Sequence, residues 1–524
     1  DAEEAEALSY KRESIDIYNA SWGPEDSSRV KYHASGSLVQ NTLERSVQLG
    51  RGGLGNIYVW AAGNGGAKGD NANYDGYGNL PWNIAVASVD QFGRQCSFSE
   101  PGSSVLICAP SDGAGADIVT TDLLGRAGQS LLDYTTGFGG TSASAPLVTG
   151  AIALMLEANP SLTWRDVQNI LVRTAVKNDP LDDGWSYNAA GYHVNHKFGF
   201  GRVDAAAAVT LAQNWETIPN GKVEYREAKN VRNWIPDNTG YTLYSTDTVE
   251  DRRPVEHVRV KLWLDHYNWG DLEIILRSPS GTESKLAAPF FRGDGPEHLL
   301  NGTASWTYLT VHNWGESAAG EWTLFVRDSR TGNSGQLISW QLILHLVDST
   351  QDKMSVLPLR DDHFLIPREF QQAVDVLHNE GDLGSKEDLR IISLYQPPYG
   401  YAFQEGYRDL KYTPGSEFSN IDIIGYTVMA KDGRIGQAHL TLEVPDRMVL
   451  DKTAAIARDS PLLIDLSLDD YQFPVGQEFH VQVTKTPDHG SVEVDDGGRV
   501  TYVPKLGYRG PDHFAYALTQ DHQQ

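Results

Sequence analysis

Residues 140–160 read GTSASAPLVTGAIALMLEANP. We expect a helix that begins next to Ser142 and ends where Asn159-Pro160 stops it. Thr163 begins the next helix, with Asp166 three residues later as the acid of a capping box. Four apolar runs upstream are typical of strands, namely Ile15–Ala20, Ile57–Ala62, Ile84–Val89 and Val105–Ala109. The alternation of strands and helices predicts an α/β unit with a parallel sheet and helices on both faces.

Ser142 is a candidate nucleophile within this stretch. A glycine turn at Gly140 and a helix start would expose the hydroxyl group at the positive end of the helix dipole. Asn64 stands in Ala62-Gly63-Asn64-Gly65-Gly66, directly after an apolar strand. Its amide there can donate a hydrogen bond to a developing oxyanion. The structural alternatives are a small-residue helix start at the serine and a plain Asn-Gly turn at the asparagine.

The composition limits the function classes. The 524 residues are 40% hydrophobic and 21% charged, which is ordinary for a globular protein of about three or four domains. A formal net charge of −26 argues against a general nucleic-acid binder and suits cationic substrates or calcium. No apolar run reaches the ~18–20 residues of a membrane span, so we expect no transmembrane segment. Two cysteines exclude a disulfide scaffold.

The pattern of apolar and polar residues changes three times along the chain. Short alternating apolar runs and turn residues begin near Trp215 and predict an all-β sandwich or jelly roll. A polar linker follows at about 348–355. We therefore expect four domains: residues 1–214 (α/β), 215–348 (all-β), 356–445 (β-repeat one) and 446–524 (β-repeat two).

The last two domains are predicted from an internal repeat. Tyr412-Thr413-Pro414 and Tyr502-Val503-Pro504 are each followed by an aromatic residue, an aspartate and a tyrosine at the same offsets. Gly400 and Gly490 also correspond. Two copies of one short β-module explain this pattern.

Several motifs together resemble the subtilisin superfamily, and within it the furin/kexin proprotein convertases. The nucleophile and oxyanion motifs match the superfamily, and longer stretches match the convertases almost continuously to about residue 214. The resemblance then extends into the convertase P domain. The matching stretches are Ser21–Asp26, Arg51–Gly55, Asn73–Tyr77, Leu156–Pro160, Leu162–Asp166, His196–Gly201, Val203–Ala205, Gly270–Leu272, Ser278–Thr282 and Gly320–Trp322.

The resemblance implies a subtilisin-like α/β catalytic domain, a β jelly-roll P domain and cleavage after paired basic residues. Ser142 would be the nucleophile and Asn64 the oxyanion donor. Asp26 and Asp75 match acids of the pocket for the cleaved residue, and carboxylates are the expected partners of Arg and Lys. The remaining implied substrate-binding residues are Ser21, Trp22, Gly23, Pro24, Tyr77 and Glu4, the last two at the second basic subsite.

Two qualifications come with this subsite assignment. Any one of these acids could be a solvated loop carboxylate, and the joint match favours a site. His33 stands where furin-like members carry another acid, which weakens the expected discrimination at the second subsite.

The resemblance also implies a calcium site beneath the first pocket. Asp26, Asp70 and Glu100 match its ligands, and carboxylate oxygens suit Ca²⁺. The ion would let several carboxylates sit together without repulsion.

A protease of this type needs a His base and an Asp that orients it. In the family both precede the serine, by more residues than precede Ser142 here. Asp182-Asp183-Gly184 and His489-Gly490-Ser491 mimic those motifs, but we assign both to structural roles. We expect a fragment that begins inside its first domain, ends inside its last, lacks the catalytic Asp and His, and alone does not catalyse proteolysis.

Cys96 and Cys108 do not match the disulfide positions usual in the family. They flank Ser103 in what would be a hairpin. We slightly favour a disulfide if the protein is exported, with two buried thiols as the alternative.

The repeats resemble cadherin-like or immunoglobulin-like tandem modules of bacterial surface proteins, and we expect them to act as plain spacers. The whole predicts a secreted or cell-surface bacterial protease that acts on proteins or peptides with basic residues, assisted by a propeptide or chaperone. One alternative is a cell-surface adhesion protein with an inactive protease-like domain. Another is a subtilase with relaxed specificity.

Overall fold

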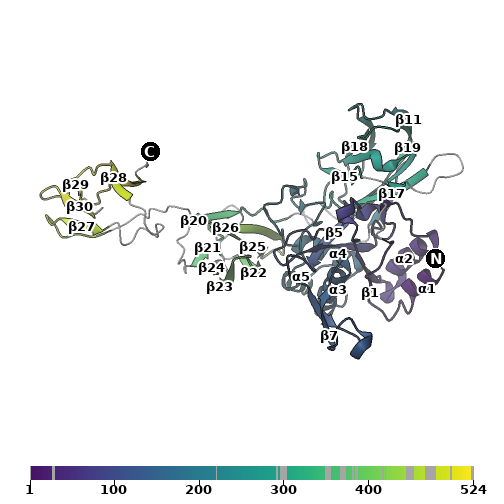
Figure 1. The fold of residues 1–524 in the computed structure, drawn as a ribbon, viewed down its shortest axis with the longest axis horizontal. Coiled ribbons are helices and arrows are strands. Elements are labelled where there is room, and N and C mark those ends of the chain that lie inside the picture. Colours follow the sequence, from purple (N-terminus) through teal and green to yellow (C-terminus); the bar gives the residue numbers. More distant parts are fainter. Residues whose placement is uncertain are drawn as a thin grey trace.

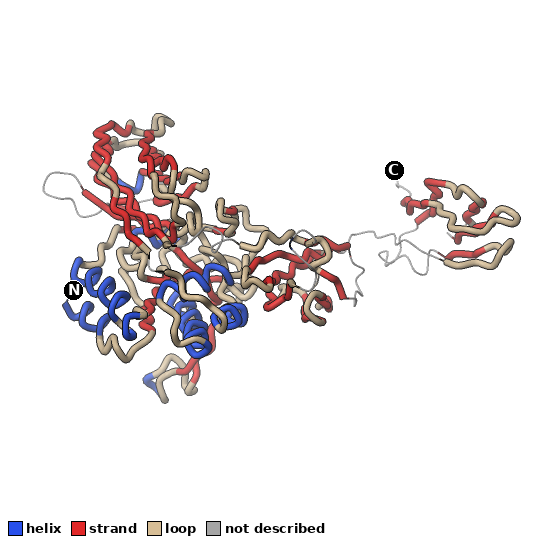
Figure 2. The backbone as a smooth tube through the Cα atoms, turned by 180° about the vertical axis from the view of Figure 1, so that it is seen from behind, coloured by secondary structure: helices blue, strands red, loops and turns tan. Residues whose placement is uncertain are grey.

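The computed structural model arranges the chain as one α/β unit followed by β units (Figure 1). The α-helices gather in the first unit, while the rest of the described chain is built mainly of strands and loops, with one short 3-10 helix at Trp269–Asp271 (Figure 2). The structure describes residues 2–25, 30–219, 221–290, 293–294, 304–348, 356–365, 373–380, 388–415, 420–443, 454–465, 479–495 and 499–520, with Leu383 and Phe418.

The first unit contains a parallel four-stranded sheet, as predicted. Its strands run in the order β1 (Ile17–Ala20), β3 (Ile57–Ala61), β4 (Asn83–Val89) and β5 (Val105–Pro110). The helices are α1 (Ala2–Ser9), α2 (Ser37–Leu49), α3 (Thr141–Ala158), α4 (Trp164–Thr174) and α5 (Ala205–Ala212). Two small hairpins complete it, β6 (Ile118–Thr121) with β7 (Tyr134–Phe138) and β8 (Ser186–Tyr187) with β9 (His193–Val194).

Strand β3 shows why helices cover both faces of this sheet. Successive side chains of a strand point to opposite faces. Ile57 and Val59 pack in one cluster with α3, α4 and α5. Tyr58 and Trp60 pack in another with α1 and α2. The prediction of helices on both faces is therefore confirmed.

Helix α3 is the central helix of this unit. With 18 residues and a mean hydropathy of 1.2, it would pass as a membrane span by length and composition alone. Its residues Val148, Ile152 and Met155 are buried in the cluster that it shares with the sheet, which accounts for the apolar sequence. The next helix begins as predicted, because Thr163 and Asp166 form a capping box.

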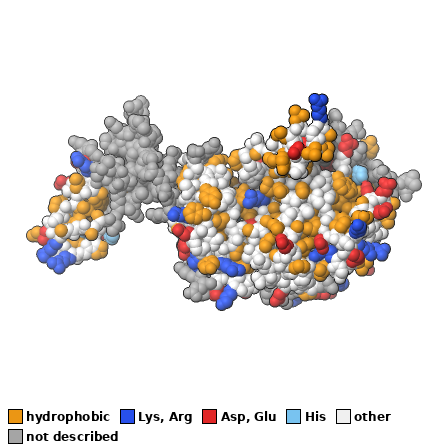
Figure 3. Space-filling view, turned by 90° about the horizontal axis from the view of Figure 1, so that it is seen from below, with side chains coloured by type: hydrophobic (Ala, Val, Ile, Leu, Met, Phe, Trp, Pro, Cys, Tyr) orange, Lys and Arg blue, Asp and Glu red, His pale blue; other side chains and the backbone are white. Residues whose placement is uncertain are grey.

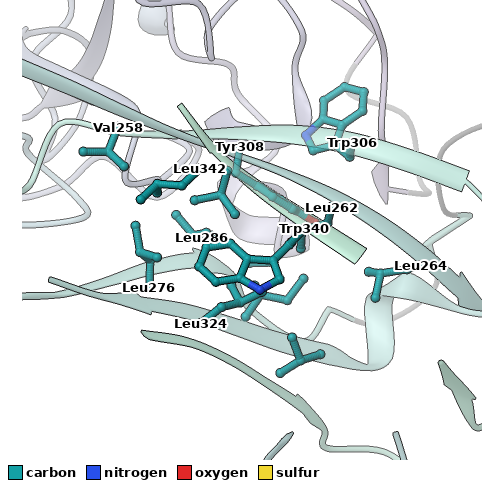
Figure 4. Close-up of a cluster of buried hydrophobic side chains, with 14 of the residues drawn as sticks. Val258, Leu262, Leu264, Leu276, Leu286, Trp306, Tyr308, Leu324, Trp340 and Leu342 are labelled. Carbon is teal, nitrogen blue, oxygen red and sulfur yellow. The ribbon is translucent and has the colours of Figure 1, made fainter. Parts of the chain in front are cut away.

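The second unit is a sandwich of two antiparallel sheets, again as predicted. One sheet is β10 (Lys222–Tyr225), β19 (Gly335–Leu346), β13 (Val255–His266) and β17 (Ala304–Thr310), with β11 (Lys229–Ile235) also on β19. The other is β12 (Leu243–Val249), β18 (Gly320–Asp328), β14 (Leu272–Arg277) and β15 (Glu283–Ala287). Leu262, Leu276, Leu324 and Trp340 fill the space between the sheets (Figure 4).

A buried ion pair joins the two units. Arg165 of α4 donates from Nε and Nη2 to the two carboxylate oxygens of Glu256 on β13, at 2.8 and 2.9 Å. The side chains are 12% and 3% exposed. Asn169 donates a third hydrogen bond to the same carboxylate at 2.8 Å. A short parallel pairing of β16 (Gly293–Asp294) with β2 (Val30–Lys31) adds backbone contact between the units.

The third and fourth units are β-sheet modules. The third has two sheets, β20 (Asp362–Leu365), β26 (Ile435–Glu443), β25 (Ile421–Ala430) and β22 (Leu389–Tyr395) in one, and β21 (Ala373–Asp375), β24 (Asp409–Pro414) and β23 (Gly400–Glu405) in the other. The fourth has β27 (Leu462–Asp465), β30 (Arg499–Pro504) and β29 (Gly490–Val494), and β28 (Phe479–Lys485) with β31 (Ala515–Gln520).

The predicted repeat corresponds to one recurring contact. Tyr412 donates its hydroxyl hydrogen bond to Asp422 at 2.6 Å, and Tyr502 donates to Asp512 at 2.8 Å. A Cβ on Gly400 would lie 2.3 Å from the ring of Tyr412, and the glycine of the other copy meets Tyr502 in the same way. The motif residues therefore pack on one another in both modules.

The third unit is not the plain spacer that the sequence led us to expect. Its Met429 and Ile435 belong to the same buried cluster as α3, α4 and α5 of the first unit. The ring of Tyr395 lies 4.0 Å from the guanidinium of Arg202. Only the fourth unit stands apart from the rest in Figures 1 and 2.

The slight preference for a disulfide between Cys96 and Cys108 is wrong, since both are free and buried. The Cys96 thiol donates to the carbonyl oxygen of Asp112 at 3.1 Å, and that of Cys108 to Asn178 Oδ1 at 3.4 Å. Burial, reinforced by nearby acids, raises the pKa of Cys96 to about 12. Both thiols act as small buried side chains with weak donors.

Two buried histidines at the junction of the first two units predict acid sensitivity. Burial lowers the pKa of His257 to about 3, helped by the charges of Arg165 and Arg259. The ring lies 5.7 Å from that of His345, whose pKa burial also lowers. Since the folded-state pKa lies below the unfolded value of about 6.5, the unfolded state binds more protons at mildly acidic pH. This stability is present above about pH 6.5 and is lost as the pH falls toward 3.

We therefore expect the free energy of unfolding to fall by about 1.4 kcal/mol per pH unit for each such histidine. Calorimetric scans between pH 7 and 4 measure this slope. His257→Phe should flatten it, because the benzyl ring keeps the contact with Trp314 and binds no proton. His363→Phe is the control, since that side chain is 56% exposed. Equal slopes in the His257→Phe variant and the unchanged chain would contradict the prediction.

Candidate active site

Ser142 is the second residue of α3 and is half-buried at its start. The turn before it depends on Gly140, whose φ of 76° favours glycine. Thr141 donates from its backbone N–H and its hydroxyl to Asn64 Oδ1, at 2.8 and 3.0 Å. The Thr141 hydroxyl accepts from the N–H of Gly63 at 3.2 Å. The two predicted residues, Ser142 and Asn64, are thus brought together across the sheet end.

A reciprocal pair of hydrogen bonds ties Ser142 to the segment after β1. Ser142 Oγ donates to the carbonyl oxygen of Ser21 at 3.2 Å, and Ser21 Oγ donates to the carbonyl oxygen of Ser142 at 2.9 Å. In a helix that carbonyl would accept from the N–H four residues later, but Pro146 has none. The Ser21 hydroxyl supplies the missing donor. Sequence reasoning missed this role, although the proline in the motif indicated an unpaired carbonyl.

A cavity of about 550 Å³ opens beside Ser142. Asp75 lies within it beneath the Ser21–Gly23 segment, since its Oδ2 would be 3.5 Å from a Cβ on Gly23. Its Oδ1 accepts from the N–H of Tyr77 at 2.8 Å. The lining comprises Ser21, Trp22, Gly23, Pro24, Glu25, His33, Ala61, Ala62, Gly63, Asn64, Asp70, Tyr74, Asp75, Glu100, Thr141 and Ser142. The cavity therefore places carboxylates within one space with the serine.

Two of the three residues predicted to hold calcium share one end of this cavity. Glu100 Oε1 accepts from the N–H of Gly65 at 2.9 Å. A Cβ on that glycine would lie 2.9 Å from Glu100 Oε1 and 3.0 Å from Asp70 Oδ2, so both oxygens border the same small space. Burial raises the pKa of Tyr74, and the charges of Asp70 and Glu100 raise it further. Asp26, the third predicted ligand and a predicted pocket acid, lies outside the described residues.

The donor set present fits a hard cation only in part. Within the part of the chain that the structure describes, no group of three or more His, Cys, Asp or Glu side chains is arranged to hold a metal ion. Two converging carboxylates are ligands of the kind that Ca²⁺ takes, but it needs six to eight oxygens.

Glu4 and Tyr77 come together beside the cavity rather than in its lining. Tyr77 donates its hydroxyl hydrogen bond to Glu4 Oε2 at 3.0 Å. Its ring stacks on Trp60 with centroids 4.9 Å apart and meets the edge of Trp22 at 5.3 Å. Burial and the neighbouring Glu4 carboxylate raise the pKa of Tyr77. The contact with Trp22 connects this predicted subsite to the segment that borders the cavity.

The two motifs that mimic an acid and a base lie in structural contacts. Asp182 forms an ion pair with Lys197 and accepts from Asn195 Nδ2 at 2.9 Å. His489 stacks on Tyr508 with ring centroids 4.1 Å apart, in the fourth unit. Among the described residues, the recorded hydrogen bond of Ser142 Oγ goes to Ser21 and none goes to a histidine.

Three parts of the chain match known protein families. Residues 1–201 match the Subtilase family, residues 255–344 match the Proprotein convertase P-domain, and residues 445–524 match the Bacterial Ig domain. The second repeat is thus immunoglobulin-like by this match.

Curated relatives cover the first two units. Proprotein convertase subtilisin/kexin type 6 of Rattus norvegicus is 42% identical over 359 residues, which is 66% of this chain and 37% of the relative. Furin of Mus musculus is 40% identical over 352 residues, 66% of this chain and 43% of the relative. Rattus norvegicus convertase type 5 is 38% identical over 361 residues, but the chain spans only 19% of its length.

Solved structures support the fold. The Aeromonas sobria serine protease, solved in complex with a chaperone, has a TM-score of 0.58 at 24% identity and covers 66% of this chain and 74% of its own. The same protease alone has a TM-score of 0.55 at 26% identity, over 64% of this chain and 72% of its own.

Position 63, next to the carboxylates of Asp70 and Glu100, leaves no room for a side chain. Its φ is 109°, and a Cβ there would lie 2.4 Å from the carboxylate of Glu100. Gly63→Ala should therefore lower the free energy of unfolding by about 2–4 kcal/mol, from backbone strain and displacement of that carboxylate. Thermal denaturation measures the loss.

Gly240→Ala is the matched control for Gly63→Ala. Its φ is 74°, and nothing lies within 4 Å of the added Cβ. It should show the backbone strain alone, about 1–2 kcal/mol. Equal losses in the two variants would show that the contact with Glu100 has no influence.

Proposed function

We propose that this chain, whose residues 1–201 form a subtilase domain and whose residues 255–344 form a proprotein convertase P domain, is part of a serine endopeptidase that cleaves after paired basic residues. The observation that carries the proposal is the cavity in which Ser142, at the start of α3, lies with the carboxylates of Asp70, Asp75 and Glu100. A nucleophile beside an acidic pocket suits a substrate with a cationic side chain before the cleaved bond.

Ser142 Oγ loses its proton to a base and attacks the carbonyl carbon of the cleaved peptide bond. The C–N bond then breaks, the amine leaves with the proton that the base returns, and water hydrolyses the acyl-enzyme that remains. The negative charge that develops on the carbonyl oxygen is stabilised by the Asn64 amide and by the first-turn N–H groups of α3. Thr141 orients Asn64 by two hydrogen bonds to its Oδ1. Ser21 holds the serine backbone in place through its hydroxyl.

The base that takes the Ser142 proton, and the carboxylate that orients this base, come from a polypeptide segment outside these 524 residues. Two features support this part of the proposal. Strand β1 lies at the edge of the described sheet, next to α3. On α3 itself, Leu147 and Leu154 are 43% and 49% exposed. A further strand packed on this edge would cover them and reach the serine.

The acids divide between two subsites. Asp75, inside the cavity, binds the basic side chain at the cleaved residue, with Asp26 as its partner. Glu4 binds the preceding basic residue beside Tyr77. Trp22, Gly23 and Pro24 form the wall along which the substrate lies. His33 also lines the cavity and lowers the negative charge available to the second basic residue.

Asp70, Glu100 and Asp26 would hold Ca²⁺ beneath the first subsite. When bound, the ion would neutralise carboxylates and fix the cavity wall that they form. It takes no part in bond cleavage. Asp70 and Glu100 instead hold the Gly63–Gly65 turn, from which Asn64 is presented.

The substrates are proteins or peptides with basic residues, and we place the protein outside the cell or on its surface. The similarity of the first two units to Furin and the match of residues 445–524 to the Bacterial Ig domain support this placement. On the face shown in Figure 3, basic side chains are scattered among acidic, apolar and neutral ones, which does not suit nucleic acid. A propeptide or chaperone would assist folding. The alternative is an adhesion protein with an inactive protease-like unit. It is favoured by the geometry of the described residues, among which Ser142 Oγ donates to the carbonyl oxygen of Ser21 and not to a histidine.

Ser142→Ala in the complete protein should abolish peptide cleavage and labelling by a fluorophosphonate probe. Asn64→Ala should be milder and reduce kcat by roughly 10²–10³, because it removes one of several oxyanion donors. Peptide kinetics and probe labelling measure both. Labelling that persists in the Ser142→Ala protein would overturn the assignment, and the adhesion alternative predicts none in either protein.

The complete enzyme should cleave Lys-Arg and Arg-Arg peptides roughly 10²–10³ faster in kcat/KM than Ala analogues, since a few kcal/mol are lost when a partly buried acid has no partner. Asp75→Asn should reduce the preference at the cleaved residue. Glu4→Gln should reduce it one residue earlier and by less. A positional peptide library measures each. Equal rates on basic and apolar peptides would instead indicate a subtilase with relaxed specificity.

Removal of calcium by a chelator should lower the melting temperature and the activity together, because Asp70 and Glu100 would then repel each other. Asp70→Ala should reproduce the change without a chelator. A melting temperature that stays constant in a sample shown by metal analysis to hold no calcium would refute the site.

A further inference from the structure

The second unit forms hydrogen bonds with the loop that carries Asp75, and Asn73 makes several of them. Asn73 is completely buried. Its Nδ2 donates to the carbonyl oxygen of Leu309 on β17 at 2.8 Å, and its Oδ1 accepts from the N–H of the same leucine at 2.8 Å. The side-chain amide thus pairs with the outer edge of β17 as a neighbouring strand would. Ser103 Oγ accepts from Nδ2 at 2.8 Å.

Three more hydrogen bonds hold the same loop. Trp306, also on β17, donates from Nε1 to the carbonyl oxygen of Asn73 at 2.9 Å. Asn79 donates from Nδ2 to the carbonyl oxygen of Thr307 at 2.9 Å. Tyr74 donates to the carbonyl oxygen of Ala288 at 3.0 Å. Residues 73–79 are therefore fixed at both ends by the P domain, with Asp75 between them.

Asp75 lies between these two ends of the loop. Its Oδ1 accepts from Tyr77, which belongs to the same loop. The loop also contacts the first unit. The backbone of His33 accepts from Gly76 at 2.7 Å and donates to Tyr74 at 2.9 Å. Ser35 Oγ donates to the carbonyl oxygen of Gly76, and Asn83 Nδ2 donates to that of Tyr77 at 2.7 Å. A charged group selects its partner only if it is held in place, so a small displacement of the loop weakens recognition.

We propose that Asn73 is a positioning residue for specificity: by binding β17, it sets where the Asp75 carboxylate stands and couples the P domain to selection of the basic side chain at the cleaved residue. This rests on the proposed function of Asp75. The residue touches no substrate.

Asn188 provides a matched control in the same interface. It is also buried, and its Nδ2 donates to two backbone carbonyls of the second unit, those of His312 and Trp314, both at 2.9 Å. It lies outside the cavity lining and outside the Asp75 loop. Asn73→Ala and Asn188→Ala therefore remove similar contacts between the units, but only the first frees the loop.

The test measures peptide binding, which needs no catalytic base. Calorimetric titration compares a peptide that ends in Lys-Arg with one that ends in Lys-citrulline, on the 524-residue chain with calcium. We expect the unchanged chain to bind the Lys-Arg peptide at least tenfold more tightly. Asn73→Ala should reduce this ratio at least fivefold, while Asn188→Ala keeps it within twofold at a similar loss of melting temperature. Ratios reduced equally in both variants would overturn the inference.

Hydrogen exchange separates this inference from the proposed function. The peptide that spans residues 73–82 should exchange faster in Asn73→Ala than in Asn188→Ala, whether or not Lys-Arg is preferred. No preference in the unchanged chain would refute the proposed specificity, and equal exchange in the two variants would refute the positioning role. If Asn73→Ala does not fold, Asn79→Ala removes the other end of the clamp and should act in the same direction.

Discussion

The buried pair of Arg165 and Glu256 is the constraint on which the arrangement of the first two units depends. Each charge comes from a different unit, and both are nearly excluded from solvent. A buried charge without a partner costs several kcal/mol of stability. Burying Arg165 without Glu256, or Glu256 without Arg165, would therefore be strongly unfavourable. The geometry satisfies this demand, with two parallel hydrogen bonds and a third from Asn169. The ion pair therefore fixes how the first two units sit against each other. The other contacts between these units, including those of Asn73, depend on the same arrangement.

Two backbone groups near the candidate active site lack their usual hydrogen-bond partners, and a side chain replaces the partner in each case. Pro146 leaves the carbonyl of Ser142 without a helical donor, and Ser21 supplies one. Among the described strands, β17 lies at the edge of its sheet, and the amide of Asn73 pairs with its outer backbone groups. In both cases a side chain replaces a missing backbone partner, because a buried polar group must be satisfied. The Ser21 hydroxyl thus holds the start of α3, and the Asn73 amide holds the loop that carries Asp75.

Local patterns in the sequence predicted the strands, the capping box at Thr163, the fold class and the repeat, because each depends on residues close in the chain. The pocket residues could be named only through resemblance to a family, and the structure gathers most of them. The free state of Cys96 and Cys108, the docking of the third unit and the role of Asn73 depend on contacts between residues far apart, such as Asn73 with Leu309. Hydrophobic periodicity and secondary-structure propensity are local properties of the sequence and do not indicate which distant residues meet. The domain boundaries and the roles of the site residues remain predictions.

The two repeats share one hydrogen bond, but the pKa of the aspartate that accepts it shifts in opposite directions. Tyr412 with Asp422 and Tyr502 with Asp512 form the same hydrogen bond. Yet burial raises the pKa of Asp422, in the unit packed on the peptidase domain. For Asp512, in the unit that stands apart, burial is slight, and hydrogen bonds from Tyr502 and backbone N–H groups lower the pKa. The motif fixes the hydrogen-bond partner, whereas the surroundings set the direction in which the carboxyl pKa shifts.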